Sequence, residues 1–108
     1  MPLYMVQTAY TNDAWGRLVQ RPEDRAEALR PVVEQMGGRL LAWYYSFGDY
    51  DVMALVELPS NINAAALSMA AAAGKAVRTV KTTPLMTPDE GFDAMVLAQG
   101  AKYVPPGA

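Results

Sequence analysis

The feature that most constrains the fold is a short break between two segments that strongly favour β-structure. Residues 39–46 include three consecutive aromatic side chains, and in residues 51–58 the apolar side chains alternate between two faces. The break between them, Phe47–Tyr50, is four residues long and contains a glycine and an aspartate, which suit a turn. Strands joined by so short a connection pair antiparallel, so the sequence predicts a β-hairpin in the middle of the chain.

A strand and a helical region precede this hairpin, and a helix and a strand follow it. The further elements, each bounded by capping residues, glycine or proline, are expected at residues 3–10, 12–20, 22–36, 60–73 and 76–83. The resulting order is that of an α+β, ferredoxin-like split βαβ fold, in which helices cover one face of a four-stranded antiparallel sheet. Because neither face of the strands is rich in charge, we expect the other face of the sheet to be covered as well.

An additional helix is expected at the C-terminus. Thr87-Pro88-Asp89-Glu90 has the form of a capping box with proline at the first helical position. The helix should run to about Gln99, with Phe92 and Met95 facing the interior. A single domain is therefore expected over residues 1–100, followed by a loose tail at 101–108.

Several methionines fall on apolar stripes and are expected to pack in the core. In the helix at 60–73, Met69 shares such a stripe with Ile62, Ala66 and Ala73. Core packing explains these methionines without a binding role.

The composition excludes several classes of function. The chain contains no His and no Cys, which removes the commonest catalytic base, the usual zinc and haem ligands and any thiol nucleophile. We therefore expect no metal and no cofactor. The formal net charge of −2 is unfavourable for nucleic-acid binding. Signal-peptide features are absent from the first residues and no stretch is long enough to span a bilayer, so we expect a cytoplasmic location and no membrane partner.

Acidic residues at the hairpin are the candidates for catalysis. A carboxylate whose pKa is raised in a cleft could act as a general base, and Asp51 and Glu57 are the candidates for that role. A structural interpretation competes with this one and is favoured. Asp49 and Asp51 suit a turn in which they accept backbone hydrogen bonds, and Glu57 can pair with a strand neighbour.

Aromatic residues and one amide are the candidates for ligand binding. Aromatic walls with a few polar tips are typical of a pocket for a planar apolar molecule, although strand aromatics also fill cores and dimer interfaces. Gln7 is the most informative candidate, because it is an uncharged polar residue among apolar neighbours on its face. The full set is Gln7, Tyr10, Trp15, Trp43, Tyr45 and Tyr50.

Three arginines precede and follow the predicted helix break. Arg17, Arg21 and Arg25 are four residues apart and would share one face of a continuous helix, but Pro22 interrupts it. Acidic residues are close by in the sequence, so we expect a solvated face of mixed charge.

The hairpin and its surroundings resemble the GYD domain family. The resemblance rests first on Gly48-Asp49-Tyr50-Asp51-Val52, followed by Glu57-Leu58-Pro59. It covers roughly residues 3–90. The other agreeing pieces are Tyr10-Thr11, Arg25, Gly37-Gly38-Arg39, Gly74-Lys75-Ala76-Val77-Arg78-Thr79 and Glu90.

This resemblance implies membership of the dimeric α+β barrel group. In that group two ferredoxin-like sheets pack face to face, and a cleft between sheet and helices can hold a small molecule. A homodimer or higher homo-oligomer is therefore implied. No particular reaction is implied, because the wider group includes cofactor-free monooxygenases, lactone isomerases and haem enzymes.

Together these observations favour a homo-oligomeric protein that binds a small apolar or aromatic molecule. A first alternative is a cofactor-independent enzyme of the monooxygenase or isomerase type, acting on a small aromatic or lactone substrate with Asp51 or Glu57 as base. A second alternative is a structural oligomer without a ligand. Whether the chain is an enzyme is left open.

Overall fold

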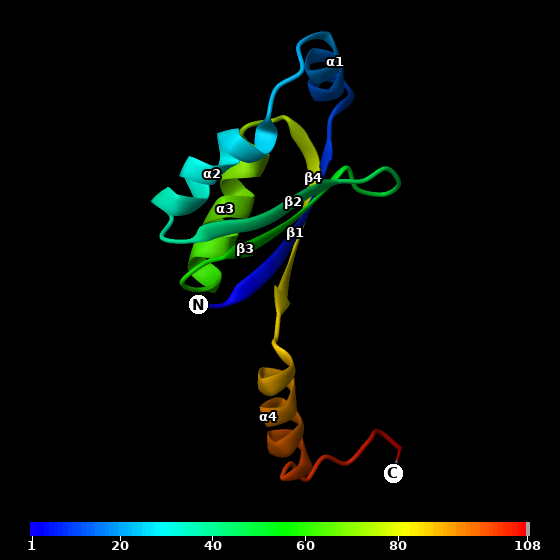
Figure 1. The fold of residues 1–108 in the computed structure, drawn as a ribbon. Coiled ribbons are helices and arrows are strands. Elements are labelled where there is room, and N and C mark those ends of the chain that lie inside the picture. The colour runs from blue at the N-terminus through cyan, green and yellow to red at the C-terminus, as the bar shows by residue number, and fades with distance from the viewer. Residues whose placement is uncertain (108) are drawn as a thin grey trace.

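The computed structural model describes residues 1–107 and contains one four-stranded sheet with four helices (Figure 1). The strands are β1 (Leu3–Tyr10), β2 (Arg39–Tyr45), β3 (Val52–Glu57) and β4 (Val77–Leu85). The helices are α1 (Asn12–Gln20), α2 (Arg25–Gln35), α3 (Asn61–Ala73) and α4 (Pro88–Gln99). The strand order is β2-β3-β1-β4, and every neighbouring pair is antiparallel. The predicted α+β, ferredoxin-like class with an additional C-terminal helix is confirmed.

Two element boundaries differ by two or more residues from those expected. The second helix begins at Arg25 rather than at Pro22, because Asp24 is its N-cap and accepts a hydrogen bond from the Glu27 backbone N–H at 3.1 Å. The last strand continues to Leu85, beyond the expected end at residue 83. It tolerates Pro84 because β4 is an edge strand, where a missing N–H need not break the ladder.

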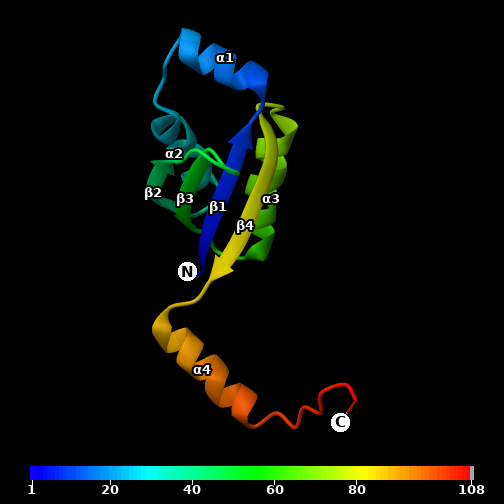
Figure 2. The same cartoon turned by 90° about the vertical axis from the view of Figure 1, so that its right-hand side faces the viewer.

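Helices α2 and α3 cover one face of the sheet and form the main core with it (Figures 1 and 2). The side chains of Tyr4 and Val56 from the sheet and Val33 from α2 are almost completely buried there. The Tyr4 hydroxyl donates a hydrogen bond to Asn61 Oδ1 at 2.7 Å, which fixes the start of α3 over β1. A smaller core cluster, built around Tyr10, Ala14 and Val52, anchors α1 at one end of the sheet.

The opposite face of the sheet is open in this chain. Figure 2 shows it turned toward the viewer, with α2 and α3 behind the strands. By the alternation of side chains along each strand, Met5, Gln7 and Leu55 lie on this face, and the exposed Tyr44 borders it on β2. The expected cover of the second face is therefore not supplied by residues 1–107 of the same chain.

The C-terminal helix α4 stands apart from the sheet and the other helices (Figures 1 and 2). Its capping box forms as predicted, with Thr87 and Glu90 exchanging hydrogen bonds of 2.9 and 3.2 Å. The expected inward orientation of Phe92 and Met95 is wrong, because their side chains are 65% and 71% exposed. The helix starts just beyond the end of β4 and extends away from the sheet, so its apolar residues have no surface of their own chain to pack on. Of the predicted tail, residues 101–105 have no regular structure, and Ala108 lies outside the described residues.

The apolar stripe predicted for α3 is also wrong. The helix buries Ala64 and Leu67, whereas Ile62 and Met69 are 81% and 70% exposed. Because nearly every residue of α3 is apolar, the sequence offers no polar side to mark the face that points to solvent.

Candidate functional site

An apolar cavity of about 340 Å³ lies between the sheet and helices α2 and α3. Its walls come from β-strand residues such as Val6 and Val56, from Leu29 and Val32 on α2, and from Leu67 on α3. The space exists because several small residues occupy positions where larger side chains would fill it. These small residues are Ala54, Ala70, Ala71, Gly74 and Ala76.

Few polar residues line this cavity, and one of them carries an unpaired buried donor. Trp43 Nε1 is buried and has no hydrogen-bond partner among the described residues. An unpaired buried donor is rare in folded proteins and costs about 1–3 kcal/mol. A molecule in the cavity that carries an acceptor would supply the missing partner. The remaining polar lining comes from Thr8, Tyr10, Arg25 and Ser68.

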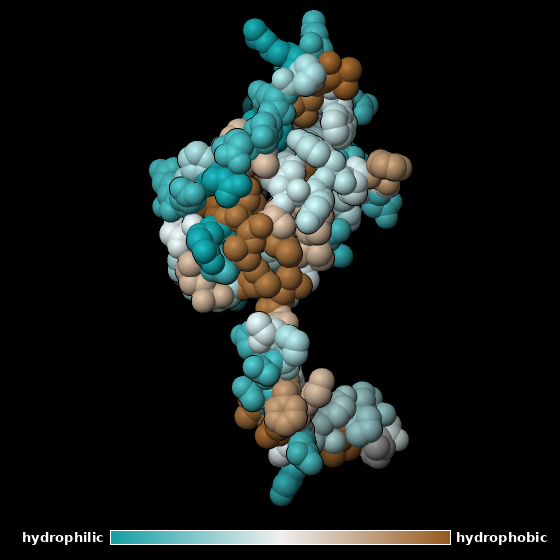
Figure 3. All heavy atoms as spheres, viewed as in Figure 1, coloured by the Kyte–Doolittle hydropathy of each residue, from teal (hydrophilic) through white to brown (hydrophobic). Residues whose placement is uncertain are grey.

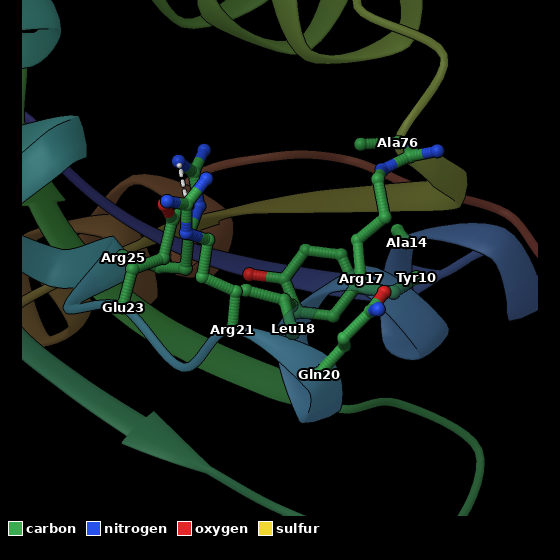
Figure 4. Close-up of a pocket in the computed structure, with 9 residues that line it drawn as sticks. All are labelled: Tyr10, Ala14, Arg17, Leu18, Gln20, Arg21, Glu23, Arg25 and Ala76. Carbon is green, nitrogen blue, oxygen red and sulfur yellow. Dashed lines mark hydrogen bonds and ion pairs between the residues drawn. The ribbon is translucent and has the colours of Figure 1, made fainter.

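A second, more open cleft of about 640 Å³ adjoins the cavity (Figure 4). It lies between α1, the start of α2 and the end of β1, and it shares Tyr10, Arg25 and Ala76 with the cavity. Its charged lining consists of three arginines and one glutamate: Arg17, Arg21, Arg25 and Glu23. Glu23 pairs with Arg25 at 2.9 Å, so the cleft keeps an excess of positive charge.

Tyr10 lies where the two spaces meet. Burial is the main cause that raises the pKa of its hydroxyl above 10.0, and the neighbouring Tyr45 adds to the effect, whereas Arg25 opposes it. The hydroxyl is therefore protonated at neutral pH and available as a hydrogen-bond donor. Its ring packs edge-to-face on Trp15, with centroids 5.2 Å apart.

Asp51 lies outside the cavity and is held by two hydrogen bonds. Its Oδ2 accepts from the Tyr10 backbone N–H at 2.8 Å and from Trp15 Nε1 at 3.1 Å. These bonds tie the start of β3 to the end of β1 and to α1. The Asp51 side chain also borders a shallow hollow on the outside of this junction, together with Trp15, Tyr45 and Phe47.

The other predicted site residues are dispersed. Glu57 pairs with Arg39 at 3.2 Å, directly across the β2–β3 ladder. Gln7 lies on the open face of the sheet, between Met53 and Lys81 in register. Tyr50 lies in the hairpin turn, where its carbonyl accepts a hydrogen bond from Ser46 Oγ at 2.8 Å. Of the residues proposed for catalysis or ligand binding, the structure brings only Tyr10 and Trp43 into the lining of the cavity.

Comparison with known protein families decides the family of the chain. The family model described as "GYD domain" matches residues 4–96, which include all four strands, both helices over the sheet and most of α4. The chain belongs to the GYD domain family. No curated protein matches it.

In this GYD domain, the stretch on which the resemblance first rested, Gly48–Val52, lies at the β2–β3 turn. Gly48 has a φ of 153°, which favours glycine, and Asp51 makes the two hydrogen bonds that connect the turn to β1 and α1. The stretch from Gly48 to Asp51 therefore builds a junction beside the cavity, and the next residue, Val52, lines the cavity wall.

Sequence reasoning missed part of the lining of the cavity in this GYD domain. Thr8 could have been found, because it lies two residues before Tyr10 on the same face of β1. The small residues of α3 gave no such signal, since alanine is common in helices for reasons of propensity alone. The arginines were expected on a solvated face of mixed charge. Arg17 and Arg21 are exposed, and the structure adds that they line one cleft together with Arg25 and Glu23.

The described part of this GYD domain offers neither a metal-binding cluster nor a membrane-spanning helix. Within residues 1–107, no three His, Cys, Asp or Glu side chains are placed to hold a metal ion. None of the helices described there combines the length and the apolar character needed to cross a membrane.

Proposed function

We propose that this GYD domain is a homodimeric protein that binds a small, largely apolar molecule in the cavity under α2 and α3. The observation that carries the proposal is the largely apolar cavity, one of whose lining residues, Trp43, has a buried Nε1 donor without a partner. The volume of about 340 Å³ is at the lower end of the range usual for ligand sites, which suits a small bicyclic or short-chain molecule.

The predicted ligand combines an apolar body with at least one hydrogen-bond acceptor. Apolar contact with Val6, Leu29 and Val32 favours the body of the ligand. An acceptor near Trp43 Nε1 replaces the missing hydrogen bond and gives the site its selectivity.

The positions of the acidic residues favour binding over catalysis. Asp51 and Glu57 are not among the residues that line the cavity, and each is engaged with partners elsewhere. A general base must reach the proton that it removes, either directly or through one water molecule. The enzyme alternative would therefore depend on the reactivity of the substrate itself.

The proposed second copy covers the apolar surfaces that one chain leaves open. One is the open face of the sheet and the other is α4, whose Phe92, Met95 and Leu97 are exposed. Figure 3 shows apolar side chains gathered over the strands and again on α4. The radius of gyration is 17.3 Å, against about 13 Å for a compact domain of this size, so a single chain is unusually extended. Surfaces of this kind mark interaction sites.

A pair of matched probes tests the ligand site. The first, 2-acetylnaphthalene, carries a carbonyl acceptor, and the second, 2-ethylnaphthalene, does not. We expect the first to bind more tightly, and we expect Trp43→Phe to reduce this difference, measured by titration calorimetry.

A variant that fills the cavity tests whether the probes bind there. Ala71→Phe places a large side chain among the lining residues of α3, whereas Ala73→Phe places it at an exposed position of the same helix. Folded Ala71→Phe should lose binding and Ala73→Phe should retain it, with circular dichroism verifying the fold. Unchanged binding to a folded Ala71→Phe variant would show that the cavity is not the site.

The dimer is tested by light scattering coupled to size exclusion. The wild type should elute with twice the mass of the chain, and Tyr44→Glu on the sheet should shift it toward the monomer. Val19→Glu introduces the same charge at an exposed position of α1 and should leave the dimer intact. A monomeric wild type at about 100 μM would contradict the homodimer.

A further inference from the structure

The arginine cleft beside the cavity holds more positive charge than the chain itself neutralises. Arg17 lies in the last turn of α1, Arg21 is the C-cap residue just after that helix, and Arg25 is the first residue of α2. All three line one hollow despite the break at Pro22, with the side chains of Arg21 and Arg25 together on one side and that of Arg17 on the other (Figure 4). The solvated face of mixed charge that the sequence predicted is therefore also the lining of a cleft.

Ion pairing leaves two of these arginines free. Arg25 pairs with Glu23, but Arg17 and Arg21 make no ion pair with any residue from 1 to 107. The C-terminal end of α1 favours nearby cations, which accounts for Arg17 in its last turn and Arg21 at its C-cap. It does not account for Arg25, which lies at the N-terminal end of α2, where the helix dipole disfavours a cation. The excess positive charge in a protein of net charge −2 indicates an anionic occupant.

The cleft and the apolar cavity adjoin each other and share lining residues. Tyr10, Arg25 and Ala76 line both spaces. Figure 4 shows the Tyr10 hydroxyl pointing toward the side of the cleft where Arg21 and Arg25 lie. A molecule whose apolar body fills the cavity would thus have its end at the arginines, within reach of a neutral hydroxyl donor.

We propose that the ligand of this GYD domain is an amphiphilic anion, whose apolar body lies in the cavity and whose carboxylate or phosphate group lies in the cleft lined by Arg17, Arg21 and Arg25. The inference rests on the proposed function, because it assigns the charge of the same ligand. Arginine suits this role, since its planar guanidinium group donates paired hydrogen bonds to carboxylate and phosphate oxygens.

Three naphthalene probes of similar size test the charge of the ligand. They are neutral 2-acetylnaphthalene, the carboxylate 2-naphthylacetate and the dianion 2-naphthyl phosphate. We expect at least one anion to bind the wild-type protein about 10-fold or more tightly than the neutral probe, with an affinity that falls as salt is added. The anion that binds more tightly identifies the head group.

A charge-matched pair of variants locates the effect. Arg17→Gln/Arg21→Gln removes two positive charges from the cleft, and Arg78→Gln/Lys102→Gln removes two from exposed positions elsewhere. The first variant should weaken binding of the anion by about 10-fold or more and leave the neutral probe unchanged. The second variant should change neither.

The outcomes separate this inference from the proposed function. If the neutral probe binds as tightly as both anions, or if the cleft variant binds the anions like the wild type, the anionic ligand is wrong while the cavity site stands. If no probe responds to Ala71→Phe, the proposed cavity site fails and the inference fails with it.

Discussion

Replacing Asp51 by alanine removes one oxygen that accepts two hydrogen bonds. The Tyr10 backbone N–H and Trp15 Nε1 donate to it at 2.8 and 3.1 Å, and both bonds are partly buried. A buried donor left without a partner costs about 1–3 kcal/mol. Because Asp51 is only partly buried, water reaches the site, and we expect a total loss of about 2–4 kcal/mol in the free energy of unfolding.

The asparagine variant separates charge from geometry. An amide oxygen can accept the same two hydrogen bonds but loses the strengthening that a charged acceptor gives, so Asp51→Asn should lose about 1–2 kcal/mol. Asp49→Ala is the matched control, since Asp49 is exposed in the same turn, and its effect should stay within about 0.5 kcal/mol.

Urea unfolding followed by tryptophan fluorescence measures these differences. Trp15 is itself one of the two tryptophans and reports on the junction directly. At fixed protein concentration, the midpoint for Asp51→Ala should fall by about 1–3 M relative to the wild type. If Asp51→Ala and Asp49→Ala unfold at the same urea concentration, the two hydrogen bonds do not stabilise the fold and the reasoning fails. If Asp51→Asn keeps full stability but loses binding of the naphthalene probes, Asp51 acts on the ligand instead.

Two further predictions concern a close backbone approach and a buried hydroxyl. Gly38→Ala places a Cβ against the Glu57 carbonyl oxygen and the Leu58 side chain, so we expect a loss of about 3 kcal/mol or more by thermal melts, whereas Gly91→Ala on α4 meets open space and should be neutral or stabilising. Similar melting temperatures for the two variants would contradict the first expectation. Because burial raises the pKa of Tyr10 in the folded state, its contribution is present below about pH 10 and is lost as the pH rises through the folded-state pKa. Wild-type stability should therefore fall more steeply between about pH 9 and 11 than that of Tyr10→Phe, and parallel pH profiles would argue against this.

Local sequence rules predicted the elements of this fold well. The hairpin follows from a short turn between two β-rich segments, and the capping box of α4 forms from Thr87 and Glu90 as their spacing requires. These features depend on residues within a few positions of one another. The family followed from the same region, because its motif is a contiguous stretch around Asp51.

Local sequence rules could not predict the contacts between residues that are distant in the chain. The donors to Asp51 lie 41 and 36 positions away in the chain, so its partners depend on how β1 and α1 meet the hairpin. The buried face of α3 was equally undetermined, since apolar residues surround that helix and packing alone selects Ala64 and Leu67.

One part of the candidate site was determined by the sequence, and another part was decided only by the tertiary structure. The alternation of side chains along β1 alone put Tyr10 and Gln7 on opposite faces of the sheet. Only the tertiary structure decided that α2 and α3 cover the face of Tyr10, which makes Tyr10 part of a cavity and leaves Gln7 on the open face. It also decided that Arg17, Arg21 and Arg25 line one cleft, although the break at Pro22 interrupts the helix that would have placed them on one face. The alternation of side chains along a strand is a local property. Which face of the sheet is covered depends instead on where the helices pack.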